Sequence, residues 1–99
     1  MKKKEFEVVF KKGKTKAGKL VFLKILKNNL DDNRFGVVVS KKISKKAVVR
    51  NKIKRRLRET IRQAHIKPGL DIIIIVRPEI IDKNYQDIKN ELENLFKNL

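Results

Sequence analysis

The sequence predicts a two-layer α/β sandwich (α+β) in which helices pack against one mixed β-sheet. Two observations support this class. Three segments repeat apolar residues at helical spacing, and three others concentrate the β-branched residues that favour strands. The predicted order is α-β-β-α-β-α, with room for one more short strand. With 99 residues and 40% apolar side chains, the chain suits a single domain, residues 1–99, with a modest core.

Helices are predicted at both ends of the chain. The apolar positions at helical spacing are Phe6, Val9 and Phe10 in the first helix, and Tyr85, Ile88, Leu92, Leu95, Phe96 and Leu99 in the last. The first helix covers residues 3–12, and Gly13 can turn the chain out of it. Asn84 or Asp82 is expected to cap the start of the last helix.

Three strands are predicted. Residues 20–26 and 35–40 are rich in strand formers, and the polar cluster 28–33 between them is typical of a loop. That loop favours an antiparallel hairpin of the two strands. Residues 71–76 form a continuous β-branched run before Pro78, so we expect them in the middle of the sheet, covered on both faces.

The longest helical pattern runs from 46 to 65 and stops at Pro68-Gly69. At about 100° per residue, one third of its circumference is apolar and is predicted to face the core. This apolar sector comprises Val49, Ile53, Leu57, Thr60, Ile61 and Ala64. The cations on the remaining surface are Lys52, Lys54, Arg55, Arg56, Arg58 and Arg62. The helix therefore combines a core-facing side with a basic side.

Net charge is the strongest indication of function. The chain has 27 Lys and Arg against 11 Asp and Glu, which gives +16. Residues 1–70 carry 23 basic and 5 acidic side chains (+18), whereas residues 71–99 carry 4 and 6 (−2). A phosphate backbone compensates such a charge by releasing its own counterions, so a nucleic acid is the expected partner, with an anionic membrane surface as the alternative.

Several chemistries are disfavoured. The chain has no cysteine, one histidine (His65) and no glycine-rich phosphate loop, so we expect no catalytic residue, metal site or bound cofactor in the protein itself. Asp31-Asp32 suits a turn better than a metal site. Glu5 and Glu7 interrupt any apolar leader, and no apolar run is long enough to cross a bilayer, so we expect a soluble, cytoplasmic protein.

The segment 41–62 holds eleven Lys or Arg and one Glu, with several cations at helical spacing. Like charges at i and i+4 repel, and a structural role does not call for them. Arginine forks grip phosphate oxygens at two points, and the amide of Asn51 can contact a base edge or a ribose hydroxyl. The alternatives are a merely solvated helix face and a basic helix for membrane or calmodulin-like targets.

Four aromatic side chains are candidates for stacking on unpaired bases: Phe6, Phe10, Phe22 and Phe35. Core packing is the competing explanation for each of them. Lys24 interrupts an apolar strand, so we expect it to point off an open face of the sheet, where it would place a charge beside a stacked base.

The pattern Lys41-Lys42, Ala47, Arg50-Asn51-x-x-Lys54-Arg55-x-x-Arg58-Glu59 resembles the signature helix of the ribonuclease P protein component. The resemblance extends over nearly the whole chain. Glu5-Phe6 and Val9-Phe10-Lys11-x-Gly13 are similar to the family's first helix, residues 35–42 to its second strand, and residues 71–78 to its late strand. Lys24 stands where many members have an aromatic residue.

This resemblance implies a fold like the second domain of ribosomal protein S5, with a left-handed β-α-β crossover. It also implies a protein that joins a catalytic RNA and assists the Mg²⁺-dependent removal of the 5′ leader from precursor tRNA, the hydrolysis being carried out by the RNA. The candidate contacts with the catalytic RNA are Lys41, Lys42, Lys45, Lys46, Arg50, Asn51, Lys52, Lys54, Arg55, Arg58 and Arg62. The candidate leader-binding cleft comprises Phe6, Phe10, Phe22 and Lys24.

Two other functions fit parts of the sequence. A ribosome-associated or assembly protein with the same fold would bind ribosomal RNA without any role in cleavage. A nuclease that acts alone would need an acid–base set that the composition does not supply.

Overall fold

The computed structural model describes residues 1–97 and 99. Its elements are α1 (Lys3–Lys12), β1 (Lys14–Ala17), β2 (Val21–Lys27), β3 (Arg34–Val38), α2 (Ala47–Gln63), β4 (Leu70–Val76), the 3₁₀ helix η1 (Pro78–Ile80) and α3 (Tyr85–Phe96). The predicted α-β-β-α-β-α order is confirmed, and β1 is the additional short strand. Asn84 caps α3, its side chain accepting a hydrogen bond from the backbone N–H of Asp87 at 2.8 Å.

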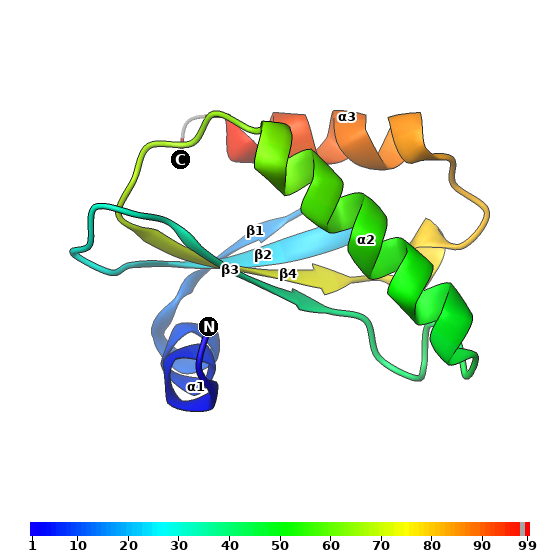
Figure 1. The fold of residues 1–99 in the computed structure, drawn as a ribbon, viewed down its shortest axis with the longest axis horizontal. Helices are drawn as coiled ribbons and strands as arrows, with labels where there is room; N and C mark the ends of the chain where they lie inside the picture. Colours follow the sequence, from blue (N-terminus) through cyan, green and yellow to red (C-terminus); the bar gives the residue numbers. More distant parts are fainter. Residues whose placement is uncertain (98) are drawn as a thin grey trace.

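The sheet has the strand order β1-β2-β4-β3. The β1–β2 and β2–β4 pairs are antiparallel and the β3–β4 pair is parallel, so the sheet is mixed as predicted. Helices α2 and α3 lie on one face and α1 lies on the other (Figure 1). In Figure 1 the chain runs along β3, returns along α2 above the sheet and enters β4 behind β3, which is the expected left-handed crossover.

The predicted hairpin is wrong, because β4 lies between β2 and β3 and pairs with both. β4 is the most apolar strand, with a run of isoleucines at its centre. A strand in the middle of the sheet is buried most completely, so β4 takes that place. The loop 28–33 spans the end of β4 instead of forming a tight turn. Its chemistry is that of a loop: Asn28 Oδ1 accepts from the N–H of Leu30 at 2.8 Å, and Asn29 has a φ of 59°.

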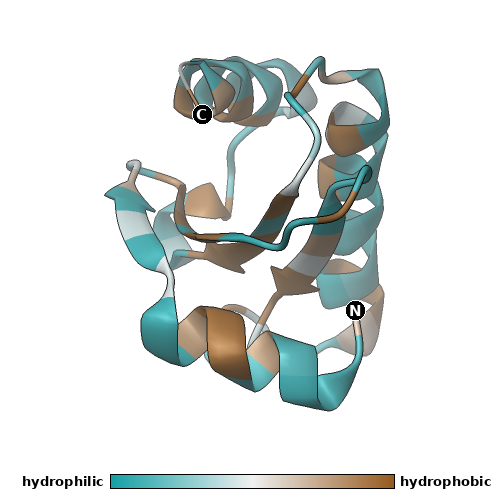
Figure 2. Ribbon diagram, turned by 90° about the vertical axis from the view of Figure 1, so that its left-hand side faces the viewer, coloured by the Kyte–Doolittle hydropathy of each residue, from teal (hydrophilic) through white to brown (hydrophobic). Residues whose placement is uncertain are grey.

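The main core lies between the sheet and the layer formed by α2 and α3 (Figure 2). The buried residues of α2 are Ile53, Leu57 and Thr60, and those of α3 are Ile88, Leu92, Leu95 and Phe96. The sheet contributes Val21, Leu23, Ile72, Ile74 and Val76. These positions confirm the predicted core-facing sides of both helices, and they fix which side of α2 remains in solvent.

Helix α1 packs on the opposite face through a small contact in which Val9 is fully buried. The Phe6 ring lies over Gly36 of β3, where an added Cβ would come within 2.9 Å of the ring. Gly13 ends the helix as predicted, but its φ of −68° is ordinary. It is needed for close approach instead, since a Cβ there would lie 2.5 Å from the carbonyl oxygen of Val9.

A network of ion pairs joins α1 to the sheet. Arg34 donates from Nε and Nη2 to the two carboxylate oxygens of Asp71 at 2.7 and 2.6 Å, and from Nη1 to Glu5 on α1. Burial alone would raise the pKa of Asp71, but hydrogen bonds from Arg34 and Asn28 outweigh it and hold the pKa below its usual value. The backbone N–H of Lys2, with Arg34 nearby, lowers the pKa of Glu5.

We predict that Asp71→Asn lowers the free energy of unfolding by about 3 kcal/mol at pH 7, because Arg34 loses its ionised partner at a nearly buried position. Both carboxyl pKa values are lower in the folded protein than in the unfolded chain. Their stabilisation is therefore complete above about pH 5 and is lost as the pH falls through the folded-state values. Urea unfolding at pH 7 and at pH 3 measures both effects.

The matched control is Glu59→Gln, which breaks a pair with Arg62 whose side chains are 42% and 74% exposed. This change should cost less than about 0.5 kcal/mol. Equal losses for the two variants would show that the network around Asp71 does not hold α1 in place.

Candidate nucleic-acid interface

The solvent side of α2 carries a stripe of polar and basic side chains. We call this set the α2 stripe: Asn51, Arg55, Arg58 and Arg62. At about 100° per residue the four positions fall within about 60° of the helix circumference, opposite Ile53 and Leu57 in the core. All four are exposed. The fold thus directs three arginines from one rigid helix into solvent.

The arginines of the stripe remain available to an external anion. Among the described residues, Arg55 and Arg58 form no ion pair or side-chain hydrogen bond. Arg62 pairs with Glu59, but this exposed pair is of the kind that contributes little and that a phosphate readily replaces. The charge of the stripe is therefore not neutralised within this part of the chain.

The other basic candidates extend the same surface. Lys41, Lys42, Lys45 and Lys46 are exposed on the segment before α2, and Lys52 is exposed on the helix itself. Lys54 and Arg50 are half-buried, and Arg50 donates from Nη1 to the carbonyl oxygen of Ser44 at 2.9 Å. Arg50 therefore also orders the turn that leads into the helix. The first turn of α2 holds no acidic residue that would repel a phosphate.

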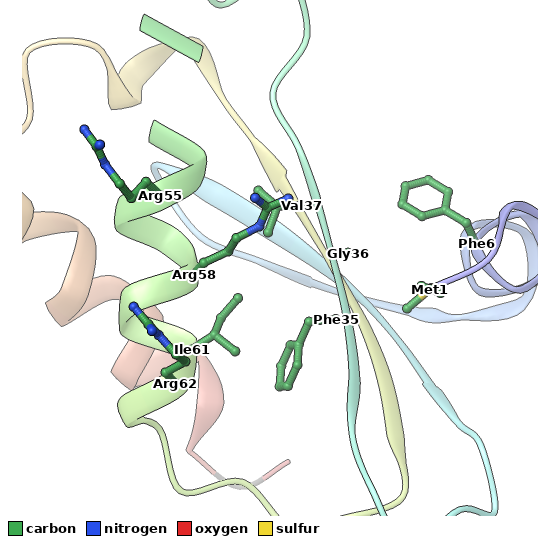
Figure 3. A pocket seen from close by; sticks show the side chains of 9 residues that line it. All are labelled: Met1, Phe6, Phe35, Gly36, Val37, Arg55, Arg58, Ile61 and Arg62. Carbon is green, nitrogen blue, oxygen red and sulfur yellow. The ribbon is translucent and has the colours of Figure 1, made fainter. Parts of the chain in front are cut away.

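A groove of about 780 Å³ runs along β3, between α1 and α2. Its lining residues are Met1, Phe6, Phe35, Gly36, Val37, Arg55, Arg58, Ile61 and Arg62. Figure 3 shows Arg58 directed from α2 toward Val37, and the Phe6 ring on the other side of the strand. The sequence placed Phe6 and these arginines on separate surfaces, and the structure brings them to one groove.

The sheet face that α1 covers at one end carries a second set of candidates. Phe22 and Lys24 alternate with the core residues of β2, so both point to the α1 side of the sheet, as predicted for Lys24. The strand register places Ala17, Phe22, Ile75 and Val38 in one row across the four strands. Each member of this row is at least partly exposed. A single apolar row is therefore open to a ligand beside α1.

One cation on this face was not singled out from the sequence. The guanidinium of Arg77 lies 5.1 Å from the centroid of the Phe22 ring. Its Nε is buried and, in the described part of the chain, has no hydrogen-bond partner. Side chains along β4 point alternately to the two faces of the sheet, and continuing this alternation past Val76 places residue 77 on the α1 face. This alternation was the sequence signal that could have identified Arg77.

The four aromatic candidates lie in three places: on α1, in the open row of the sheet and against the main core. Phe6 and Phe10 stack with ring centroids 5.8 Å apart, and Phe10 is 42% exposed on α1. Glu5, which points to the Arg34 network, and Phe10 lie on opposite flanks of the buried side of α1, so Phe10 faces the open row that contains Phe22. Phe35 packs against the main core on the α2 side, which is the core-packing alternative stated for these rings.

Within residues 1–97 and 99, no three His, Asp or Glu side chains come together as a metal-binding group. No helix in that part of the chain has the length and apolar character needed to cross a bilayer.

Comparisons with known proteins agree with this geometry. A family model described as Ribonuclease P matches residues 1–99. The ribonuclease P protein component of Clostridium botulinum (strain 657 / Type Ba4) is 44% identical over 99 residues, which cover 97% of this chain and 88% of that protein. The component from Synechocystis sp. (strain ATCC 27184 / PCC 6803 / Kazusa) is 43% identical over 95 residues, covering 93% and 77%.

Solved structures give the same result. The RNase P protein from Thermotoga maritima matches with a TM-score of 0.88 at 33% identity, over 96% of this chain and 91% of that one. The Staphylococcus aureus RNase P protein matches with a TM-score of 0.86 at 37% identity, over 98% and 90%.

Fold and surface together define a small, strongly basic α/β protein of the class that works with RNA. The chain belongs to the ribonuclease P protein family, whose members are the protein subunit of the ribonucleoprotein that processes tRNA 5′ ends. In this endoribonuclease catalysis is carried out by the RNA.

Proposed function

We propose that residues 1–99 act as one RNA-binding domain in the cytoplasm, with two surfaces for two RNAs. The α2 stripe and the lysines beside it bind the catalytic RNA. The open sheet face with Phe22 and Lys24, and the flank of α1 with Phe6 and Phe10, bind the 5′ leader of precursor tRNA. The observation that carries the proposal is the set of exposed arginines on α2 that have no strong internal partner.

The two surfaces suit different ligands. Arginines on a rigid helix match the phosphates of a folded RNA, where charge neutralisation dominates affinity. The row beside α1 offers apolar surface and an aromatic ring, with Lys24 and Arg77 next to the ring. Unpaired bases stack on such rings while cations hold the backbone, so this face suits a single strand. Mature tRNA lacks the leader, so the second surface favours substrate over product.

We assign the hydrolysis to the RNA and to Mg²⁺ ions that it holds. The chain has a single histidine, His65, and no cysteine, so it lacks a histidine pair or thiolate for acid–base or nucleophilic catalysis. The part of the protein in this reaction is to bind and to orient the two RNAs. His65 lies after α2 and lines a hollow with Glu93 and Phe96 of α3, none of which belongs to either proposed surface.

The proposal is tested by adding the purified protein to precursor tRNA at low Mg²⁺, with and without the catalytic RNA. We expect stimulated removal of the leader when both are present. A ribosomal or assembly protein would leave cleavage unchanged, and a nuclease acting alone would cut without the RNA. Either of these results contradicts the proposal.

We predict that the double variant Arg55→Ala/Arg58→Ala binds the catalytic RNA more weakly and with a weaker salt dependence. Each lost phosphate contact removes about 0.7 to 0.9 from the slope of log affinity against log salt, so the slope should fall by about 1.4 to 1.8. A filter-binding series in salt measures the slope. The control Lys83→Ala/Lys97→Ala removes the same charge from exposed positions elsewhere and should leave the slope unchanged. Equal effects of the two pairs would refute the assignment to α2.

We predict that Lys24→Ala weakens binding of the assembled complex to precursor tRNA by about threefold to tenfold, because one backbone contact of the leader is lost. Binding of mature tRNA, which has no leader, should not change. Fluorescence titration with both tRNAs gives the ratio of the two affinities. An equal loss for precursor and mature tRNA would place Lys24 outside the leader site.

A further inference from the structure

Helix α3 holds the β1–β2 turn, residues 18–20, from the face of the sheet opposite α1 (Figure 1). The contact is made by Glu91 of α3. One of its carboxylate oxygens accepts hydrogen bonds from the backbone N–H groups of Leu20 and Val21, at 2.7 and 2.9 Å. The other oxygen accepts from the N–H of Lys19 at 2.8 Å. A single side chain therefore binds three successive backbone donors at the turn.

Gly18 allows the carboxylate to come this close. A Cβ at residue 18 would lie 2.9 Å from Oε2 of Glu91 and 2.8 Å from the carbonyl oxygen of Val21. The N–H of Gly18 donates to that same carbonyl oxygen at 2.9 Å and closes the turn. Only glycine therefore permits the turn and the carboxylate to meet without a shift of the backbone.

A second contact joins β1 to the end of α3. Nζ of Lys16 donates to the carbonyl oxygens of Leu95 and Lys97, at 2.7 and 2.9 Å. The last carbonyl groups of a helix lack partners within it and carry the negative end of its dipole, so an ammonium group is favourable there. We call Glu91 and Lys16 the α3 clasp.

The turn that Glu91 binds also sets the place of a cation and a ring on the other face of the sheet. Leu20, whose N–H binds Glu91, accepts a hydrogen bond on its carbonyl oxygen from the N–H of Arg77 at 2.8 Å. The guanidinium of Arg77 lies 5.1 Å from the centroid of the Phe22 ring. A displacement of the turn would therefore displace both groups.

Strand β1 connects the second contact to the same face. Side chains alternate along a strand, so Lys16 points to α3 while Thr15 and Ala17 point to the α1 side. The hydroxyl oxygen of Thr15 accepts a hydrogen bond from Nζ of Lys24 at 2.5 Å. Because β1 has four residues and, among the described strands, pairs with β2 alone, its contact with α3 is an important part of what fixes it.

We infer, on the basis of the proposed function in which the leader binds the open sheet face, that the α3 clasp positions that face. The two residues of the clasp touch no RNA themselves. They hold Phe22, Lys24 and Arg77 in one arrangement before the leader binds. Side chains that are already ordered lose less conformational freedom on binding, so the affinity for the leader is higher. A helix outside both proposed RNA surfaces thus contributes to the preference for substrate over product.

Two substitutions of Glu91 test this role. Glu91→Ala removes all three hydrogen bonds, whereas Glu91→Gln keeps one acceptor oxygen and turns an amide N–H toward a backbone donor. In the assembled complex, we expect Glu91→Ala to weaken binding of precursor tRNA by about threefold to tenfold, and Glu91→Gln to weaken it less. The affinities for mature tRNA and for the catalytic RNA should not change. Fluorescence titration with each RNA gives these affinities.

Two further variants separate position from charge. Gly18→Ala displaces the carboxylate without changing the net charge, so we expect it to weaken binding of precursor tRNA alone, as Glu91→Ala does. The control Glu93→Ala removes the same charge from an exposed position of α3 that pairs with Lys89 at 3.8 Å. This control should change each affinity less than twofold.

Amide hydrogen exchange of the folded protein shows whether the effect is local. In Glu91→Ala we expect faster exchange at residues 19–21 and unchanged protection in β4. Loss of protection throughout the sheet would mean that Glu91 supports the whole fold instead of the turn, and would overturn the inference.

Equal losses for precursor and mature tRNA in Glu91→Ala would also overturn it, as would unchanged affinity for both. Failure of the proposed leader site is recognised separately, because Lys24→Ala would then leave the ratio of the two affinities unchanged. If Lys24→Ala lowers the ratio while Glu91→Ala and Gly18→Ala do not, the leader site stands and the role of the α3 clasp is refuted.

Discussion

The arrangement depends on helix α2 burying one side in the core while it holds an arginine-rich side in solvent. The buried residues of α2 are Ile53, Leu57 and Thr60. Their contact with the core offsets the repulsion among the cations on the other side of the helix. Because the core fixes the rotation of the helix about its axis, the arginines form a surface of defined shape. A flexible basic tail would carry the same charge without that shape. The excess of 27 Lys and Arg over 11 Asp and Glu is the charge that an RNA partner would neutralise.

The strand order turns this helix into part of a larger surface. With β4 in the centre, β3 becomes an edge strand, so one edge lies between α1 and α2. The α2 stripe, the edge groove and the open row beside α1 are therefore neighbouring surfaces. The network of Glu5, Arg34 and Asp71 holds α1 at its end of the sheet and leaves the row with Phe22 uncovered. Stability and binding geometry thus share the same contacts.

The sequence was sufficient where a property is local. The periodicity of 46–65 predicted the bounds of α2 and its buried side, and the isoleucine run predicted the central place of β4. The sequence was insufficient where the result depends on the order of the strands in the sheet. The loop 28–33 has hairpin composition, yet the greater apolar character of β4 separates β2 from β3. The edge groove and the Arg77–Phe22 contact join residues distant in sequence, which no local pattern reveals.

Chemical footprinting of lysines measures whether the catalytic RNA lies against the basic side of α2. The intact protein is acetylated in the presence and absence of the catalytic RNA, and the modification of each lysine is measured by mass spectrometry. We expect strong protection of Lys45, Lys46 and Lys52, beside the α2 stripe, and no protection of the exposed Lys83. Unchanged reactivity of Lys52, together with protection of Lys83, would mean that the RNA binds away from α2 and would refute the role assigned to this helix.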